Sequence, residues 1–189
     1  LVLTVYLVGL LLAAALFQVV VVGFFDIDSW LYTYWWSQFL GEILVIGALS
    51  MGIVYLAVRF IVFGHSEFDE RLDGIIYAMA AGLGIATVVN FAYVIQHGGV
   101  DLGIGSIRMV TNALGYACFA SVLGYFMGQA RFEKTPAYYL PAGVAIAATL
   151  NGLYFFLLDR NGSGQLGPNP WLDLVLAAAT HLADDPDVV

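Results

Sequence analysis

Four polar side chains inside long apolar stretches are the residues of this chain best suited to chemistry. They are Glu42, Asn90, Tyr116 and Asn151. A polar group at hydrocarbon depth costs free energy unless it faces protein or water, so we expect these side chains to point into a bundle interior. Glu42 is the strongest functional element, because an intramembrane carboxylate can accept protons or bind a metal. We expect its carboxyl to be protonated or hydrogen-bonded to a neighbouring polar group or water.

The elements that must position these residues are long apolar helices. Of 189 residues, 61% are hydrophobic and only 11% are charged, and the mean hydropathy is +0.89. An apolar run of about 20 residues can cross a lipid bilayer. Such runs predict five spans, at about 1–25, 38–63, 72–97, 106–128 and 137–159. A sixth apolar stretch, 171–182, is short for a crossing. The expected fold is all-α, a polytopic transmembrane helix bundle with five to six spans.

We expect a single domain, with a transmembrane bundle over 1–183 and an acidic C-terminal tail over 184–189 that contains Asp184, Asp185 and Asp187. The net charge of -8 argues against a nucleic-acid partner, which needs a basic surface. The chain starts with Leu1 inside an apolar run, so we expect a further N-terminal segment. We interpret 1–25 as a spanning helix rather than a signal peptide because it lacks a basic leader.

Small residues recur at intervals of four along the predicted third and fourth spans. The third span carries Gly74, Ala78, Gly82 and Ala86, and the fourth carries Ala120, Gly124 and Gly128. Small residues at this spacing let helices approach closely in lipid. Asn90 continues the first series, and Tyr116 continues the second. We therefore predict tight helix packing and a layer of polar groups roughly 6–15 Å below one membrane interface.

This polar layer has two interpretations. It could be a cluster of interhelical hydrogen bonds that fixes helix register, each contributing about 0.6 kcal/mol. It could also be a site for a metal, a substrate or an ion. A catalytic zinc ion normally has three protein ligands drawn from His, Cys and carboxylates. His65, His97 and His181 lie outside the layer, which offers Glu42 as a carboxylate, so the residues predict no stoichiometric zinc.

Aromatic residues gather ahead of the second span, at Trp30, Tyr32, Tyr34, Trp35 and Trp36. They are typical of an interfacial aromatic belt in contact with the lipid bilayer. Trp and Tyr also dominate interface hot spots, so these residues are candidates for contact with another membrane protein subunit.

Basic residues predict the orientation of the chain. The loops after the second and fourth spans carry Arg59, Arg71, Arg131 and Lys134, and the opposite side carries Arg108 and Arg160. This bias predicts a cytoplasmic N-terminus, and we expect a multi-pass protein of a prokaryotic cytoplasmic membrane.

The order of these features resembles the PrsW-type intramembrane metalloproteases, which are related to the CAAX-processing membrane endopeptidases. The most specific part is Glu67-Phe-Asp-Glu-Arg-Leu-Asp-Gly-Ile-Ile-Tyr77 followed by Gly82-Leu-Gly84, which is similar to the family's acidic loop and glycine-rich helix. The resemblance implies a zinc-dependent protease, and it also implies that most ligand positions differ here. Gly41-Glu42 stands where the family has two glutamates, and Val89 stands where the family has a glutamate before Asn90. Tyr116 and Asn151 occupy two histidine positions of the family.

Three functions remain open. The favoured one is a catalytically inactive scaffold or accessory subunit of a membrane complex, because the packing residues are kept and the ligands are not. The second is an active intramembrane protease with an atypical zinc site, in which Glu42 is base or ligand. The third is a small transporter or ion-pathway protein, against which the sequence shows neither an inverted repeat nor a second intramembrane carboxylate.

Overall fold

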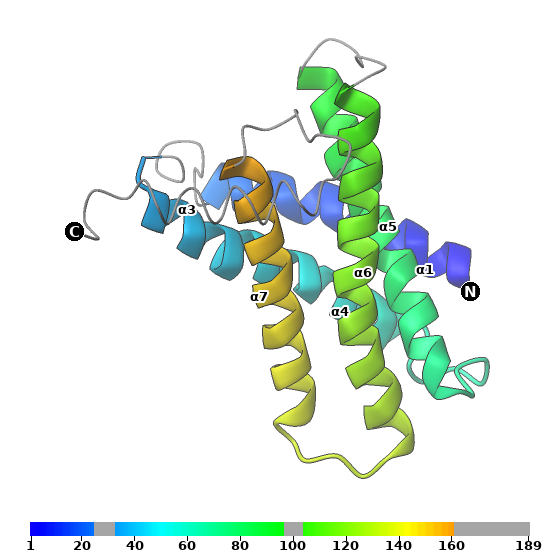
Figure 1. Ribbon diagram of the computed structural model, residues 1–189. Helices are drawn as coiled ribbons and strands as arrows, with labels where there is room; N and C mark the ends of the chain where they lie inside the picture. Colours follow the sequence, from blue (N-terminus) through cyan, green and yellow to red (C-terminus); the bar gives the residue numbers. More distant parts are fainter. Residues whose placement is uncertain (25–32, 97–103, 161–189) are drawn as a thin grey trace.

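The computed structural model describes residues 1–24, 33–96 and 104–160, and regular structure in these ranges is entirely helical (Figure 1). In chain order the elements are α1 (Val2–Leu16), the π-helical η1 (Phe17–Phe24), α3 (Trp35–Gly41), the π-helical η2 (Glu42–Gly47), α4 (Ala48–Ile61), α5 (Arg71–Gln96), α6 (Ile104–Phe132) and α7 (Tyr139–Arg160). The predicted sixth stretch at 171–182 and the acidic tail at 184–189 lie outside the described residues.

Five helical segments in the described ranges are long and apolar enough to cross a membrane: Val2–Val20, Trp35–Ile61, Arg71–Ile95, Gly105–Phe132 and Tyr139–Leu158. The all-α transmembrane fold class is therefore confirmed. The second span begins at Trp35, earlier than predicted, because Ser37 closes a cap on Tyr34. The Ser37 hydroxyl donates to the Tyr34 carbonyl at 2.7 Å and accepts from the Tyr34 N–H at 3.2 Å. Trp35 and Trp36 therefore lie in the first turn of this span.

Helices α5 and α6 pack side by side through the small residues that the sequence singled out (Figure 1). A Cβ added at Gly82 would lie 2.7 Å from the Tyr116 carbonyl oxygen. The backbones of Gly74 and Gly124 are likewise in close contact, and the backbone of Gly128 contacts the Arg71 carbonyl. A side chain at these positions would separate the two helices, so the small residues set the distance between α5 and α6.

Helix α1 crosses α5 on a different face. Gly84 lies against the backbone of Tyr6 and Leu10, and Gly9 lies against the backbone of Ala81. The Tyr6 hydroxyl and the Thr87 hydroxyl form a hydrogen bond of 2.9 Å across this contact. In Gly82-Leu-Gly84, the first glycine therefore allows close contact with α6 and the second allows close contact with α1.

The segment that joins α4 to α5 is anchored by Phe68. Its ring is 1% exposed and stacks between the rings of Tyr77 and Phe132, at 6.0 Å and 6.1 Å. Arg131 donates a hydrogen bond of 2.9 Å to the His65 carbonyl and lies 5.0 Å from the Phe68 ring centre. The loop is therefore fixed to the ends of α5 and α6.

The acidic residue Asp73 has a structural role in this loop. Its carboxylate accepts hydrogen bonds from the backbone N–H groups of Asp69, at 3.0 Å, and Glu70, at 2.8 Å, ahead of the first turn of α5. These donors have no partner within the helix, so the carboxylate fixes where α5 begins.

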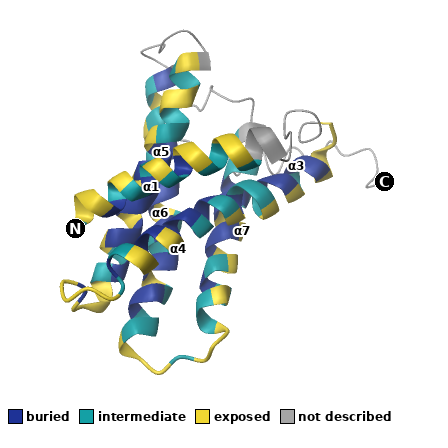
Figure 2. Cartoon of the chain, turned by 180° about the vertical axis from the view of Figure 1, so that it is seen from behind, coloured by how far each residue is buried: buried dark blue, intermediate teal, exposed yellow. Residues whose placement is uncertain are grey.

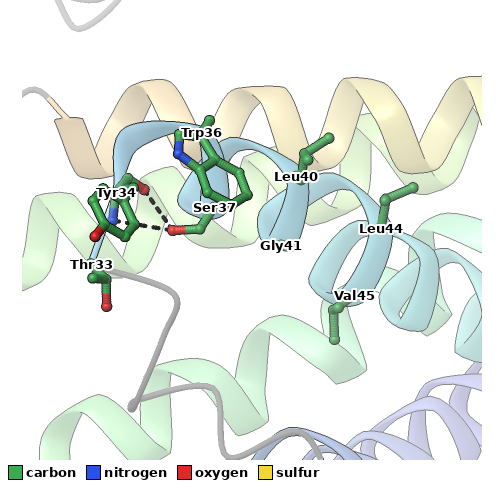
Figure 3. A pocket seen from close by; sticks show the side chains of 8 residues that line it. All are labelled: Thr33, Tyr34, Trp36, Ser37, Leu40, Gly41, Leu44 and Val45. Carbon is green, nitrogen blue, oxygen red and sulfur yellow. Dashed lines mark hydrogen bonds between the residues drawn. The ribbon is translucent and has the colours of Figure 1, made fainter.

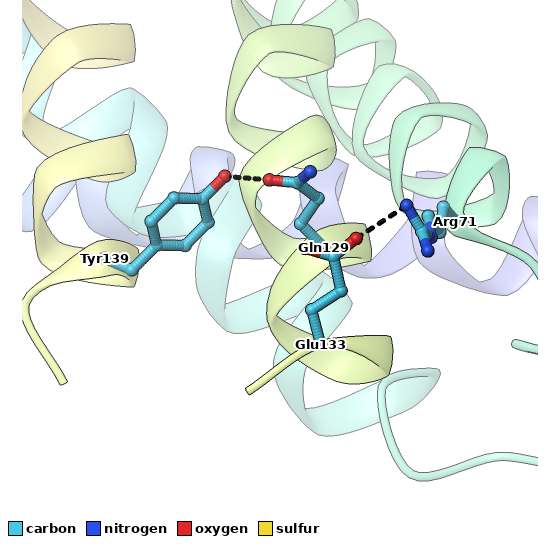
Figure 4. Close-up of polar contacts among 4 residues, drawn as sticks. All are labelled: Arg71, Gln129, Glu133 and Tyr139. Carbon is cyan, nitrogen blue, oxygen red and sulfur yellow. Dashed lines mark hydrogen bonds and ion pairs between the residues drawn. The ribbon is translucent and has the colours of Figure 1, made fainter. Parts of the chain in front are cut away.

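Polar contacts join three helices at the same end of the bundle (Figure 4). Arg71 of α5 forms an ion pair of 2.6 Å with Glu133, which follows α6, and the Tyr139 hydroxyl of α7 donates to the Gln129 side chain of α6. Figure 2 shows the buried residues where helices meet and the exposed residues on the outer faces. Many exposed residues are large and apolar, such as Phe60 at 78%, as expected for a surface that faces lipid.

Candidate functional site

Glu42 is the first residue of η2, a π-helical turn in the first half of the second span. Seven residues separate it from Trp35, which puts it about 10 Å along the helix. Its side chain is only 5% exposed and interacts within the protein. Glu42 therefore faces the bundle interior rather than the headgroups. Such π-helical turns inside α-helices occur frequently at functional sites.

Two glycines bring η2 and α7 into backbone contact at this turn. A Cβ added at Gly152 would collide with the carbonyl oxygen of Glu42, and one at Gly47 would collide with the carbonyl oxygen of Ala148. Neither glycine was expected to have this role, because each lies outside the stripes of small residues with a spacing of four. Their effect is to bring α7, and with it Asn151, close to Glu42.

Tyr116 and Ser50 complete the surroundings of Glu42. Both are buried, at 2% and 0% exposure. Ser50 and Glu42 both lie close enough to Tyr116 to interact with its phenol group. The Ser50 hydroxyl also donates to the Ile46 carbonyl at 2.7 Å. Ser50 was not among the residues predicted from the sequence, although it lies about two turns after Glu42 and so on a similar helix face.

Asn151 is 0% exposed and lies one residue before Gly152. Neither its Oδ1 nor its Nδ2 has a hydrogen-bond partner among the described residues. We call the set Glu42, Ser50, Tyr116 and Asn151 the polar junction, because it lies where η2, α4, α6 and α7 meet.

Asn90 and Asn112 form a separate unit between α5 and α6. Asn112 Nδ2 donates to Asn90 Oδ1 at 3.0 Å, and Asn90 Nδ2 donates to the Met109 carbonyl at 3.0 Å. These bonds tie α5 to α6, as an interhelical register lock would. The expected single layer is thus divided into a hydrogen-bonded amide pair and the polar junction.

An apolar groove of about 350 Å³ lies on the outer side of α3 and η2 (Figure 3). Trp36, Leu40 and Leu44 line it together with neighbouring residues between Thr33 and Val45. Tyr34 and Trp35 are each 60% exposed, and Trp36 is 51% exposed. Trp30 and Tyr32, the other aromatic interface candidates, lie outside the described residues.

The polar junction does not fit a catalytic zinc ion. Its side chains are one carboxylate, one amide, one phenol and one hydroxyl, whereas such an ion normally has three ligands drawn from His, Cys and carboxylates. Within residues 1–24, 33–96 and 104–160, no three such side chains lie close enough to hold a metal ion. Surroundings of oxygen atoms and one amide nitrogen, with a single carboxylate, can bind or exchange protons or hold polar ligands without further residues.

Comparison with known proteins places the chain in a family. The model of the PrsW family intramembrane metalloproteases matches residues 2–180. Proteins named Protease PrsW are 36% identical over 107 residues in Geobacillus kaustophilus (56% of this chain, 46% of that protein) and 29% identical over 149 residues in Oceanobacillus iheyensis (77% and 66%). The Bacillus subtilis Protease PrsW is 30% identical over 124 residues (65% and 56%).

The chain spans from under half to about two thirds of the length of these relatives. No solved structure matches it at a significant level. The family match covers nearly the whole chain and agrees with the acidic loop, the glycine-rich helix and the five apolar spans. The chain belongs to the PrsW family of intramembrane metalloproteases.

Proposed function

We propose that this chain is a PrsW-family bundle that does not hydrolyse peptide bonds and serves as a scaffold or accessory subunit next to another membrane protein. The observation behind this proposal is the make-up of the polar junction. Metal-dependent hydrolysis needs a metal to generate hydroxide and a base to move protons. Glu42 cannot readily serve as metal ligand and base at once. Tyr116 and Asn151 occupy positions at which the family resemblance implies histidines.

The outer surface supports a binding role. Tyr34, Trp35 and Trp36 are exposed beside the apolar groove on α3 and η2. Large aromatic side chains are enriched in interface hot spots, and an apolar groove along a span suits one transmembrane helix of a partner subunit. An aromatic belt that touches only lipid headgroups is the competing account.

The test is the size of the native assembly. Native membranes solubilised in mild detergent are run on blue-native gels, and co-purifying proteins are identified by mass spectrometry. We expect the chain to migrate in a complex that Trp35→Ala weakens. Phe60→Ala is the matched control, because Phe60 is an exposed aromatic residue on α4, away from the groove. Migration only as a monomer of 20.4 kDa plus detergent would contradict the proposal.

The alternative is an active protease with an atypical zinc site, and the burial of Glu42 inside the bundle favours it. Elemental analysis of the purified chain separates the two functions. We expect much less than one zinc per chain, with no change on Glu42→Gln. About one zinc per chain, lost in Glu42→Gln but kept in Ser50→Ala, would establish the protease function instead.

We also propose that the end of the bundle near the Phe68 loop is cytoplasmic, in a prokaryotic cytoplasmic membrane, with the N-terminus on the same side. Support comes from the basic residues at this end. Arg59 and Arg131 both lie over the Phe63 ring, at 4.3 Å and 5.7 Å, and Arg71 pairs with Glu133. Positive charge in short loops favours the cytoplasmic side. Reporter fusions after residue 134 should be active in the cytoplasm, and export of the reporter would refute this orientation.

A further inference from the structure

The amide of Asn151 is buried without the hydrogen bonds that such a group requires. Its side chain is 0% exposed, and both Oδ1 and Nδ2 lack a partner among the described residues. The amides of Asn90 and Asn112, by contrast, are bonded to each other. Buried polar atoms are nearly always paired with protein or ordered water, because an unpaired one carries the full desolvation penalty. An unpaired amide therefore indicates a ligand.

The contacts of α7 show where this amide points. Ala148 and Gly152 face η2, whereas Tyr154 and Phe155 face α6, with the Phe155 ring 4.8 Å from the Tyr116 ring. Asn151 comes three residues after Ala148 and three before Tyr154. At 100° per residue it lies on the helix face midway between these two residues, and so between the η2 and α6 contacts. Its amide is thus aimed into the polar junction.

We propose that Asn151 and Glu42 hold ordered water in a buried hydration site at the polar junction. The amide needs an acceptor for Nδ2–H and a donor for Oδ1. Water meets both needs, whereas a metal cation would coordinate Oδ1 and leave Nδ2 unpaired. Buried water typically makes about three hydrogen bonds in a polar site. The amide supplies two, and the Glu42 carboxyl supplies a further partner.

This hydration site gives the carboxyl of Glu42 a partner for proton exchange inside an otherwise apolar bundle. It does not depend on whether the chain hydrolyses peptide bonds or has a partner subunit. An accessory subunit would use the site to keep its interior polar groups solvated. The hydration of Asn151 can therefore be tested apart from the proposed function.

The first test is the sign of a stability change. Asn151→Leu replaces the amide by an apolar group of similar size. If water satisfies the amide, the variant loses those hydrogen bonds, and the unfolding temperature in detergent should fall by about 2–4 °C. If the amide is unpaired in the native protein, the same variant should raise the unfolding temperature, which would overturn the proposal. Thr149→Val is the matched control, because Thr149 is exposed on the same helix and its hydroxyl donates to the Ala145 carbonyl one turn earlier.

The second test identifies the ligand directly. A crystal structure from a lipid phase should show density about 2.7–3.2 Å from Asn151 Oδ1 or Nδ2, at hydrogen-bond distance. The unfolding temperature should be equal in sodium and choline chloride at the same ionic strength. A map without that density would overturn the proposal. Stabilisation by sodium that disappears in Asn151→Leu would also overturn it, because the ligand would then be a cation.

Discussion

At Gly82, where α5 contacts α6, we predict that a larger side chain will destabilise the fold. A Cβ at this position would lie 2.7 Å from the Tyr116 carbonyl oxygen and 2.8 Å from the Ala120 Cβ. Ordinary contacts begin at 3.4 Å, so even one added carbon requires the helices to separate by 0.7 Å at that point. Gly82→Leu adds three more carbons to the same space. Overpacking of this kind costs about 1–3 kcal/mol or more.

Asn90→Ala gives the scale for comparison. It removes the amide bonds between Asn90, Asn112 and the Met109 carbonyl. An interhelical hydrogen bond in a membrane protein contributes about 0.6 kcal/mol on average. At about 2–4 °C per kcal/mol for a chain of this size, Gly82→Leu should lower the unfolding temperature by roughly 2–12 °C, and Asn90→Ala, which loses two such bonds, by roughly 2–5 °C.

Gly52 supplies a matched control, because it lies in the spanning helix α4 and a Cβ there would meet nothing within 4 Å. Gly52→Leu should leave the unfolding temperature unchanged or raise it, because leucine is the better helix former by somewhat under 1 kcal/mol. All three variants are compared with the unsubstituted chain by thermal unfolding in one detergent, followed by far-UV circular dichroism. A ranking in which Asn90→Ala is the most damaging, or in which Gly52→Leu equals Gly82→Leu, would refute the packing argument.

Three further predictions concern the loop, the amide pair and the surface ion pair, each measured by the same unfolding assay. Phe68→Ala should lower stability by about 3–5 kcal/mol because its ring is fully buried, and a loss below about 1 kcal/mol would contradict the anchoring role. A double-mutant cycle of Asn90→Ala and Asn112→Ala should give a coupling of about 0.6 kcal/mol, and strict additivity would show that the bond contributes nothing. Arg71→Ala should cost at most about 1 kcal/mol, because its pairing with Glu133 is exposed, and the loss should shrink at high salt.

Sequence reasoning located the spans and the α5–α6 packing residues because both are local properties. Hydropathy over a span length predicts a crossing without knowledge of its neighbours. Gly74 and Gly124 could be identified from the sequence because small residues at a spacing of four in a membrane helix usually mark a close contact with another helix. The start of the second span was placed too late, since the cap that Ser37 forms on Tyr34 depends on side-chain geometry rather than hydropathy.

Only the tertiary structure decided which polar residues meet. Periodicity assigned Glu42, Asn90, Tyr116 and Asn151 a similar depth and inward faces, but it could not assign their neighbours. Asn90 pairs with Asn112 and the Met109 carbonyl, whereas Glu42 lies near Tyr116 and the α7 turn of Asn151. The cause is helix packing: α5 fits against α6 through small residues along both helices, and the glycines at 47 and 152 bring α7 against the π-helical turn of η2. The sequence by itself thus determined that polar groups would be buried, and the contacts between helices determined which of them form the polar junction.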